Sequence, residues 1–271
     1  MPPGLADFRD RVAVVTGASS GIGAQLARDL AQRGAHVALL ARRLDRLEAL
    51  ANELGRTGIT ALPVVCDVAE RASVDDAIAS VLRQLGHVDL LVNNAGYVTH
   101  ALFKDHDVAD MERMVRTNLL GTIYTIKAVL PSMRARRQGW IVNLSSVAGK
   151  LGQPDEAVYS ATKFAVAGLS EGISYELAPL GIHVMTVYPA LVRTEMFTDE
   201  ILARMPARAK REFREPPEFT RAVLRALGRG SFEVTVPGYV NIAYVMRAIW
   251  PALHRRITAR LRLPVLPDLT S

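Results

Sequence analysis

The sequence has a single cysteine, Cys66, and this scarcity excludes two ways of holding a chain together. Disulfide frameworks need pairs of cysteines and thiolate zinc sites need several, so neither organises this fold. The 271 residues contain no uncharged apolar run of about 18 residues, the length expected of a membrane-spanning helix. The chain does not open on a basic segment followed by an apolar core, so we expect no signal peptide. These absences are consistent with a cytoplasmic protein.

The sequence also lacks any recognised nucleic-acid-binding motif, although its net charge is +6. Nucleic acid is one partner that suits such a charge, but the arginines are scattered over the expected helix faces. We therefore expect a solvated basic surface and no nucleic-acid partner. A basic cleft for an anionic cofactor, or contact with an anionic membrane surface, would use the same charge.

No internal repeat, low-complexity tract or interdomain linker divides the chain. Strand-like apolar runs alternate with helical periodicity as far as residue 237, which is typical of one doubly wound α/β domain. We predict a single Rossmann domain over residues 1–237, with a mainly parallel seven-stranded sheet, and a C-terminal helical extension over residues 238–271. The expected strands cover residues 11–16, 35–40, 61–66, 89–92, 139–144, 183–188 and 232–237.

A glycine-rich turn separates the first expected strand from the helix that follows it. Glycines let the backbone approach phosphate groups closely, and a helix N-terminus attracts their negative charge. A strand, such a turn and a helix, in this order near the N-terminus, predict a dinucleotide-binding site. The candidate cofactor contacts in the turn are Gly17, Ser19, Ser20, Gly21, Ile22 and Gly23.

No carboxylate stands at the end of the second expected strand, where an acid would accept from the ribose 2′-hydroxyl of NAD. Arg42 and Arg43 stand there instead, and a guanidinium suits the 2′-phosphate of NADP. We therefore expect NADP(H) rather than NAD(H), with Arg42 as the closer phosphate contact. The alternative is that both arginines are solvated residues at the start of a helix.

Polar residues follow several other expected strands, at the edge where an open parallel sheet binds ligands. Asp67 either accepts from the adenine amino group or caps the helix that starts near residue 71. The run 93–96 after the fourth strand fits a tight turn beside a ligand. The candidate cofactor contacts at these ends are Asp67, Val68, Asn94, Ala95, Gly96 and Pro189.

Tyr159 and Lys163 lie four residues apart on an expected helix, and therefore on one face of it. A phenol has a pKa of about 10, and an ammonium held nearby lowers that pKa by favouring the phenolate. Such a pair suits acid/base catalysis, although the same spacing also occurs on exposed helix faces. Asn118 lies in the middle of another helical pattern, over residues 108–136. It either faces solvent or holds a local kink or a water there.

Together these residues resemble the short-chain dehydrogenase/reductase family, from about residue 11 to residue 194. The run 16–23 has the family's Thr-Gly-x-x-x-Gly-x-Gly motif, and the run 93–96 has its Asn-Asn-Ala-Gly motif. Ser145 competes with Ser146 for the family's serine, but Ser146 has the usual position, thirteen residues before the tyrosine. The residues that match the family's catalytic tetrad are Asn118, Ser146, Tyr159 and Lys163.

The resemblance implies hydride transfer between a nicotinamide cofactor and a carbonyl or alcohol of a small molecule. It implies that Tyr159 is the general acid/base, that Lys163 lowers its pKa and binds the ribose, and that Ser146 donates to the substrate oxygen. Asn118 would hold a water for proton relay. Pro189-Ala190 departs from the family's Pro-Gly. The loop beyond it would bring Val192 and Thr194 to the carboxamide and the phosphates.

The resemblance also implies a homodimer or homotetramer, formed through the helices that carry Asn118 and Tyr159. The alternative is a catalytically idle NADP(H)-binding or membrane-surface interaction protein, which should have lost at least one tetrad residue. Residues 191–218 have a weak pattern and are expected to form a lid over the site. Its apolar residues favour an apolar substrate: Leu191, Met196, Phe197, Ile201 and Leu202.

The C-terminal extension is apolar first and basic afterwards. Residues 234–246 carry no charge before Arg247. Trp250 and its apolar neighbours then precede a series of arginines that includes Arg260 and Arg262. We favour a helix packed on the domain or on another subunit. The alternatives are a segment that guards an apolar substrate entrance, or one that lies on the inner face of an anionic membrane.

Overall fold

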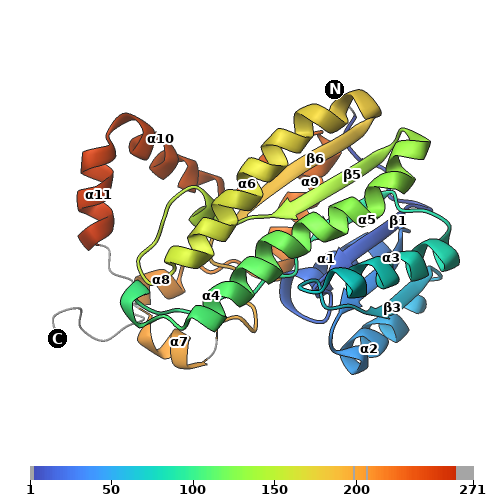
Figure 1. Ribbon diagram of the computed structural model, residues 1–271, viewed down its shortest axis with the longest axis horizontal. Helices are drawn as coiled ribbons and strands as arrows, with labels where there is room; N and C mark the ends of the chain where they lie inside the picture. The colour runs from blue at the N-terminus through green and yellow to red at the C-terminus, as the bar shows by residue number, and fades with distance from the viewer. Residues whose placement is uncertain (1–2, 198, 206, 261–271) are drawn as a thin grey trace.

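The computed structural model describes residues 3–197, 199–205 and 207–260, and Figure 1 shows their arrangement. Seven strands form one sheet in the order β3-β2-β1-β4-β5-β6-β7, and each neighbouring pair is parallel. The predicted doubly wound sheet is confirmed. The strands are β1 (Val12–Thr16), β2 (His36–Ala41), β3 (Ala61–Val65), β4 (Leu90–Asn93), β5 (Gly139–Leu144), β6 (Ile182–Pro189) and β7 (Glu233–Val236).

Helices cover both faces of this sheet. The helices of the described residues are α1 (Gly21–Ala31), α2 (Leu44–Gly55), α3 (Arg71–Leu85), α4 (Val108–Met114), α5 (Gly121–Arg136), α6 (Ala157–Leu177), α7 (Asp199–Arg204), α8 (Ala207–Lys210), α9 (Pro216–Gly228), α10 (Asn241–Ile249) and α11 (Pro251–Arg260). Helices α1, α2 and α9 share one core cluster with the sheet, and α3, α5 and α6 share the other. On β1, Val15 belongs to the first cluster and Val14 to the second, since the side chains of a strand alternate between faces. Burial on both faces explains the continuous apolar runs of the sequence.

The strand order of the sheet reverses its direction between β1 and β4. From β1 the chain moves outward to β2 and β3, and then returns to build β4 on the other side. The connections after β1 and β4 therefore diverge, which opens a crevice at the carboxyl ends of the strands. The glycine-rich turn and residues 93–96 both lie at this crevice.

The expected long helix over residues 108–136 is interrupted. Helix α4 is followed by a π-helical segment, η2 (Val115–Leu120), and then by α5. Asn118 lies in this segment and is 1% exposed, so the alternative in which it faces solvent is wrong. A π turn adds one residue to the helical repeat, and such turns are frequent at functional sites.

The expected lid contains two short helices, α7 and α8, and its last residues already belong to α9. Its two ends are joined, because Arg193 N donates to Arg214 O at 3.0 Å and Arg214 N donates to Leu191 O at 2.9 Å. Phe197 and Phe213 meet edge to face, with ring centroids 4.8 Å apart. The lid segment is therefore a closed loop that is anchored where it leaves β6 and where it enters α9.

The C-terminal helices extend away from the sheet, as Figure 1 shows. Helix α10 buries none of its residues, and Ile242 on it is 73% exposed. It reaches the domain through Arg247, which donates to the Lys150 carbonyl and lies over the Phe164 ring. Tyr244 of the same helix also meets the domain, with its ring centre 5.0 Å from Lys150 Nζ, and the packing of the tail on the domain or on another subunit stays a prediction. Arg262 belongs to residues 261–271, which lie outside the described residues.

The remaining helical elements of the described residues are three-residue 3₁₀ turns: η1 (Phe103–Asp105), η3 (Val147–Gly149), η4 (Ala178–Leu180) and η5 (Gly238–Val240). None of the helices in the described part of the chain is both long enough and apolar enough to cross a membrane.

Candidate active site

The glycine-rich turn after β1 packs directly on the turn after β4. Gly17 has φ +65°, in the left-handed region that favours glycine, and a Cβ there would lie 2.9 Å from Ala95 Cα. A Cβ on Gly23 would lie 2.3 Å from Gly17 O. Side chains at these two positions would therefore force the turn open. The bare backbone that remains is the surface a diphosphate needs.

Two side chains tie the ends of β1 and β4 together. Thr16 Oγ1 accepts from the backbone N–H groups of Asn94 and Ala95, both at 3.0 Å. Asn94 Nδ2 donates to Thr16 O at 2.9 Å. Asn94, expected as a cofactor contact, thus holds the crevice in shape through its own hydrogen bonds.

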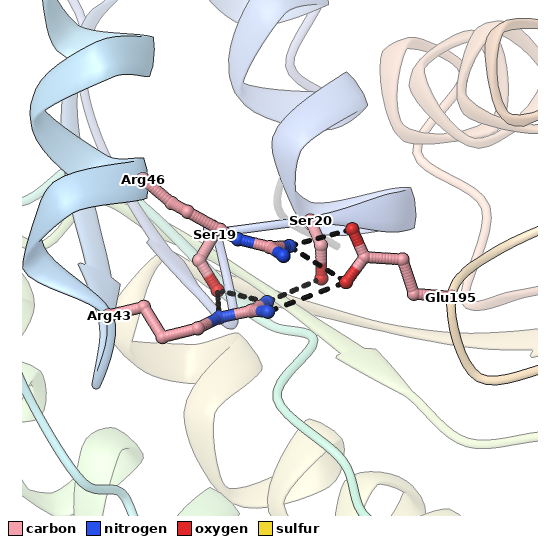
Figure 2. A network of polar contacts seen from close by, with 5 residues as sticks. All are labelled: Ser19, Ser20, Arg43, Arg46 and Glu195. Atoms are coloured by element: carbon pink, nitrogen blue, oxygen red, sulfur yellow. Dashed lines mark hydrogen bonds and ion pairs between the residues drawn. The ribbon is translucent and has the colours of Figure 1, made fainter.

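The arginines at the end of β2 have different partners. Arg43 Nη2 donates to Ser19 Oγ at 2.9 Å and to Ser20 Oγ at 3.1 Å, as Figure 2 shows. Arg42 instead lies 4.0 Å from Asp67 Oδ2. Both arginines line the same cavity. The guanidinium that contacts the glycine-rich turn is therefore that of Arg43, not that of Arg42.

Figure 2 also shows two charged residues that the sequence analysis missed. Glu195, from the lid segment, lies 2.7 Å from the guanidinium of Arg46 and 3.4 Å from that of Arg43. Arg43 is the N-cap residue of α2 and Arg46 lies in its first turn, so both guanidiniums come from the start of this helix. The short spacing of the two arginines was visible in the sequence, whereas the approach of Glu195 was not.

Asp67 does not cap α3. The N-cap residue of α3 is Glu70, so that alternative is wrong. Asp67 Oδ1 accepts from Ala69 N at 3.0 Å and stabilises the turn that follows β3. Its carboxylate lines the cavity beside Val68.

The structure separates the two candidate serines at the end of β5. Ser145 is buried, and its Oγ donates to Lys163 O at 2.8 Å, so it joins β5 to α6. Ser146 Oγ accepts from Ala148 N at 3.1 Å and also hydrogen-bonds with Tyr159. Of the two serines, Ser146 is therefore the one that both caps the turn and hydrogen-bonds with the Tyr159 phenol.

Tyr159 and Lys163 lie in the cavity wall, but their side chains are not hydrogen-bonded to each other. Lys163 Nζ donates to Leu144 O at 2.9 Å and lies 5.6 Å from the centre of the Tyr159 ring. Burial and the negative charge of Glu156 raise the pKa of Tyr159, whereas the bond with Ser146 lowers it. Burial lowers the pKa of Lys163 to about 8.

Asn118 connects the turn after β4 to helix α6. Its Oδ1 accepts from Tyr97 N at 2.8 Å, and its Nδ2 donates to Tyr97 O at 2.9 Å and to Thr162 Oγ1 at 3.1 Å. A Cβ on Gly96 would lie 3.6 Å from Asn118 Oδ1 and 3.8 Å from Lys163 Nζ. Asn118 thus fixes the turn beside Lys163 and lies behind the cavity wall.

One cavity of about 510 Å³ brings the predicted site residues together. Gly23 and Asn118 are the two that do not line it. The predicted residues that do line it are Gly17, Ser19, Ser20, Gly21, Ile22, Arg42, Arg43, Asp67, Val68, Asn94, Ala95, Gly96, Ser146, Tyr159, Lys163, Pro189, Val192 and Thr194.

Besides the predicted cofactor and tetrad residues, the cavity is lined by one apolar group and one polar group of side chains, here called its apolar wall and its polar wall. Of the apolar lid residues expected there, Leu191, Met196, Phe197 and Ile201 line it, whereas Leu202 does not. Met205 completes the apolar wall. The polar wall was missed by the sequence analysis, and it comprises His100, Gln153, Asp155 and Glu156.

Comparisons with known proteins agree with this geometry. An uncharacterized oxidoreductase of Staphylococcus haemolyticus is 34% identical over 238 residues, which cover 88% of this chain and 96% of that protein. An alcohol dehydrogenase from Thermococcus sibiricus, solved in complex with 5-hydroxy-NADP, is 30% identical with a TM-score of 0.74, and the match covers 83% of this chain and 95% of that one. A xylitol dehydrogenase solved with NAD⁺ is 28% identical with a TM-score of 0.77, and the match covers 84% and 98%.

A family model described as short chain dehydrogenase matches residues 11–204. This range contains the glycine-rich turn, the π-helical segment with Asn118, and the Ser146, Tyr159 and Lys163 side chains. The chain therefore belongs to the short-chain dehydrogenase family of oxidoreductases.

Proposed function

We propose that this protein transfers a hydride between NADP(H) and a carbonyl or secondary alcohol of a small molecule. The observation that carries the proposal is the meeting of Ser146, Tyr159 and Lys163 in the cavity that the glycine-rich turn opens. Gly17 and Gly23 let the glycine-rich turn pack closely on the turn after β4, and such a turn at the N-terminus of a helix suits a diphosphate. When bound, the nicotinamide supplies the hydride chemistry, and the chain supplies orientation and electrostatics.

In this proposal the phenol of Tyr159 donates a proton to the carbonyl oxygen during reduction and accepts one during oxidation. The Ser146 hydroxyl donates a hydrogen bond to the same oxygen as negative charge develops on it. The ammonium of Lys163, 5.6 Å from the phenol ring centre, stabilises the phenolate that remains. Asn118 holds the turn beside Lys163 and positions a water for proton relay.

The preference for NADP(H) rests on the guanidiniums near the glycine-rich turn. No carboxylate follows β2, whereas Arg42 and Arg43 line the cavity and Arg46 lies beside Arg43. Guanidiniums bind a phosphate through paired, charge-assisted hydrogen bonds. The similar structures hold an NADP derivative in one case and NAD⁺ in the other, so the preference rests on this chain's own residues.

We propose carbonyl reduction of a largely apolar substrate in the cytoplasm as the working reaction. The apolar wall formed by Met196, Phe197 and Ile201 supports this choice. A catalytically idle protein is disfavoured because each residue of the proposed tetrad is present in the sequence.

The experiment is a panel of carbonyl compounds and alcohols, with the absorbance of NADPH as the readout and Tyr159→Phe as the blank. We expect turnover of at least one apolar ketone by the wild type, and a loss of at least about a hundredfold in Tyr159→Phe. NADPH binding, measured by fluorescence, should remain nearly intact in this variant. Normal turnover by Tyr159→Phe would refute the proposed role of this residue.

We also propose assembly into a homodimer or homotetramer through α5 and α6, because large apolar side chains on α6 are exposed. Tyr175 is 70% exposed, and Phe164 is 36% exposed. Sedimentation velocity of the wild type and of Tyr175→Asp tests this. A monomeric wild type would refute it.

A second candidate activity, contact with an anionic membrane surface, is favoured by the C-terminal helices. Trp250 is 59% exposed and Val245 is 55% exposed. Arg255 and Arg256 follow on α11, so an apolar face and a cluster of cations occupy the same end of the molecule. Helices that lie in the interfacial region of anionic membranes combine these two properties.

A further inference from the structure

Three titratable side chains form a cluster in the polar wall of the cavity, and the proposed hydride reaction does not use them. His100 comes from the segment after β4, and Asp155 and Glu156 come from the segment that leads into α6. All three line the cavity. Their side chains are 14%, 8% and 19% exposed, so the cluster is largely shielded from bulk solvent.

The backbone fixes the position of this cluster. Ala101 N donates to Asp155 O at 3.1 Å, which joins the two segments. Asp155 has φ +59°, a left-handed conformation that aspartate and asparagine tolerate better than most residues. Glu156 is the N-cap residue of α6, but its side chain makes no capping hydrogen bond. Neither carboxylate is therefore needed to begin the helix.

The polar atoms of the cluster are incompletely paired. His100 Nδ1 lies 3.3 Å from Glu156 Oε1 and 4.0 Å from Asp155 Oδ2. Among the described residues, His100 Nδ1 and Asp155 Oδ2 are buried and lack a hydrogen-bond partner. Buried polar atoms in native proteins are almost always paired, so this cluster has hydrogen-bonding capacity that the described residues leave unused, on side chains that line the cavity.

The protonation states suit a neutral partner that both donates and accepts. Burial raises the pKa of Asp155 to about 6, and burial with the charge of Asp155 raises that of Glu156 to about 7. Burial also lowers the pKa of His100. Near pH 7 the cluster therefore offers an ionised carboxylate that accepts and a neutral imidazole that donates or accepts. A hydroxyl group matches this set.

We propose that His100, Asp155 and Glu156 form a polar subsite that binds a hydroxyl group of the substrate, remote from the carbon that reacts. The subsite rests on the proposed function, because it uses the same cavity. Glu156 precedes Tyr159 by one helical turn, about 5 Å along α6, so the hydroxyl lies several bonds from the carbonyl. Because the same cavity is also lined by Met196, Phe197 and Ile201, the substrate class is a hydroxylated apolar ketone or the corresponding diol.

The test compares ketones that differ only in the remote group. One series is 4-hydroxycyclohexanone, 4-methoxycyclohexanone and cyclohexanone. The other is 4-(4-hydroxyphenyl)butan-2-one, its methyl ether and 4-phenylbutan-2-one. We expect the wild type to prefer the hydroxy member of at least one series by about tenfold or more in kcat/KM, because an unpaired polar site rejects the analogue that lacks the hydroxyl. Equal values of kcat/KM in both series would overturn the proposal.

Variants then test which residues cause the preference for the hydroxy ketone. Asp155→Gly removes the carboxylate at a backbone conformation that glycine adopts freely, and Asp155→Asn keeps the shape while removing the charge. We expect the hydroxy-to-deoxy ratio of kcat/KM to fall toward one in Asp155→Gly and to fall partly in Asp155→Asn. Asp105→Asn, which changes an exposed acid on the same side of the fold, is the matched control and should keep the wild-type ratio. A ratio that persists in Asp155→Gly would mean that the cluster holds only ordered water.

Direct binding separates a failure of this subsite from a failure of the proposed reaction. If the wild type reduces none of these ketones, calorimetry on the NADP⁺-loaded protein compares cyclohexane-1,4-diol with cyclohexanol. Tighter binding of the diol that is lost in Asp155→Gly would support the subsite without any turnover. Equal binding of the two alcohols would overturn it. Tighter binding of 4-aminocyclohexanol than of the diol would also overturn it, since a cation would then be the preferred partner.

Discussion

The carboxylate of Glu195 lies 2.7 Å from the guanidinium of Arg46, which joins the lid segment to the start of α2. The same carboxylate lies 3.4 Å from Arg43, whose guanidinium reaches Ser19 in the glycine-rich turn. Glu195 therefore faces the cations that we propose to bind the 2′-phosphate of NADP(H). An ion pair this exposed stabilises a fold by only about 0–1 kcal/mol, so its main effect is on binding.

Glu195→Gln should lower the KM for NADPH several-fold, because it removes a carboxylate that competes with a phosphate for Arg43 and Arg46. The KM for NADH should change little. Steady-state kinetics with a fixed ketone measures both constants. Glu215→Gln, which alters another lid carboxylate that pairs with an arginine, is the matched control. An equal change for the two cofactors would contradict this reading of Glu195.

Arg42→Ala and Arg43→Ala should each raise the KM for NADPH about tenfold or more, and the KM for NADH far less. Comparison of the two variants decides which guanidinium contacts the phosphate more closely. Arg56→Ala, at the other end of α2, serves as a control for the general effect of losing a positive charge. If each variant raises the KM for NADPH and the KM for NADH by the same factor, the proposed cofactor preference is wrong.

The pH dependence of alcohol oxidation should respond to Glu156. The proposed base in that direction is the Tyr159 phenolate, and the negative charge of Glu156 disfavours it. Since the pKa of Glu156 is about 7, this charge is present in the alkaline range. Glu156→Gln should therefore lower the pKa of Tyr159 and shift the rise of kcat/KM to lower pH. An unchanged or upward shift of that rise would refute the electrostatic link.

The two serines at the end of β5 should respond differently to removal of their hydroxyls. Ser146→Ala should lower kcat by about a hundredfold or more, because its hydroxyl is proposed to donate to the reacting oxygen, and it should also cost about 1 kcal/mol through the lost bond from Ala148 N. Ser145→Ala removes the bond to Lys163 O and should cost about 1 kcal/mol, or a few degrees in Tm. Kinetics and thermal unfolding of the two variants check this. If Ser145→Ala lost this activity and Ser146→Ala kept it, the proposed roles of the two serines would be exchanged.

The C-terminal helices should carry any affinity for membranes. We expect the wild type to bind vesicles that contain anionic lipid, and a chain that ends at Pro237 not to bind them. Trp250→Ser should weaken binding, since it removes an exposed apolar side chain. Neutral vesicles provide the control for the basic residues. Equal binding of the full-length and shortened chains to anionic vesicles would contradict a membrane role for the C-terminal helices.

Much of the fold could be predicted because its signals are local. A strand such as β1, buried on both faces, must be a short apolar run, and a turn that packs on the backbone at Ala95 must be glycine. The Tyr159 and Lys163 pair is visible because a helix places residues four apart on one face. These features depend on short stretches of chain and were therefore present in the sequence.

The tertiary structure decided what depends on distant segments. It distinguished Ser145 from Ser146 through the Lys163 carbonyl, and it buried Asn118 by inserting a π turn. It also placed Glu195 against Arg46, nearly 150 residues away in sequence. No spacing rule could reveal these contacts, because each depends on how helices and loops pack at the carboxyl edge of the sheet.

Taken alone, the sequence determined the family, since the glycine-rich turn and the Tyr159 and Lys163 pair lie in short, regular segments. The proposed substrate-binding part of the cavity was decided by the tertiary structure alone. There the lid supplies the apolar wall, and Asp155 meets His100 only because the segment before α6 hydrogen-bonds to the segment after β4. A site assembled from irregular segments has no period in the sequence, so its chemistry emerges only when the chain is folded.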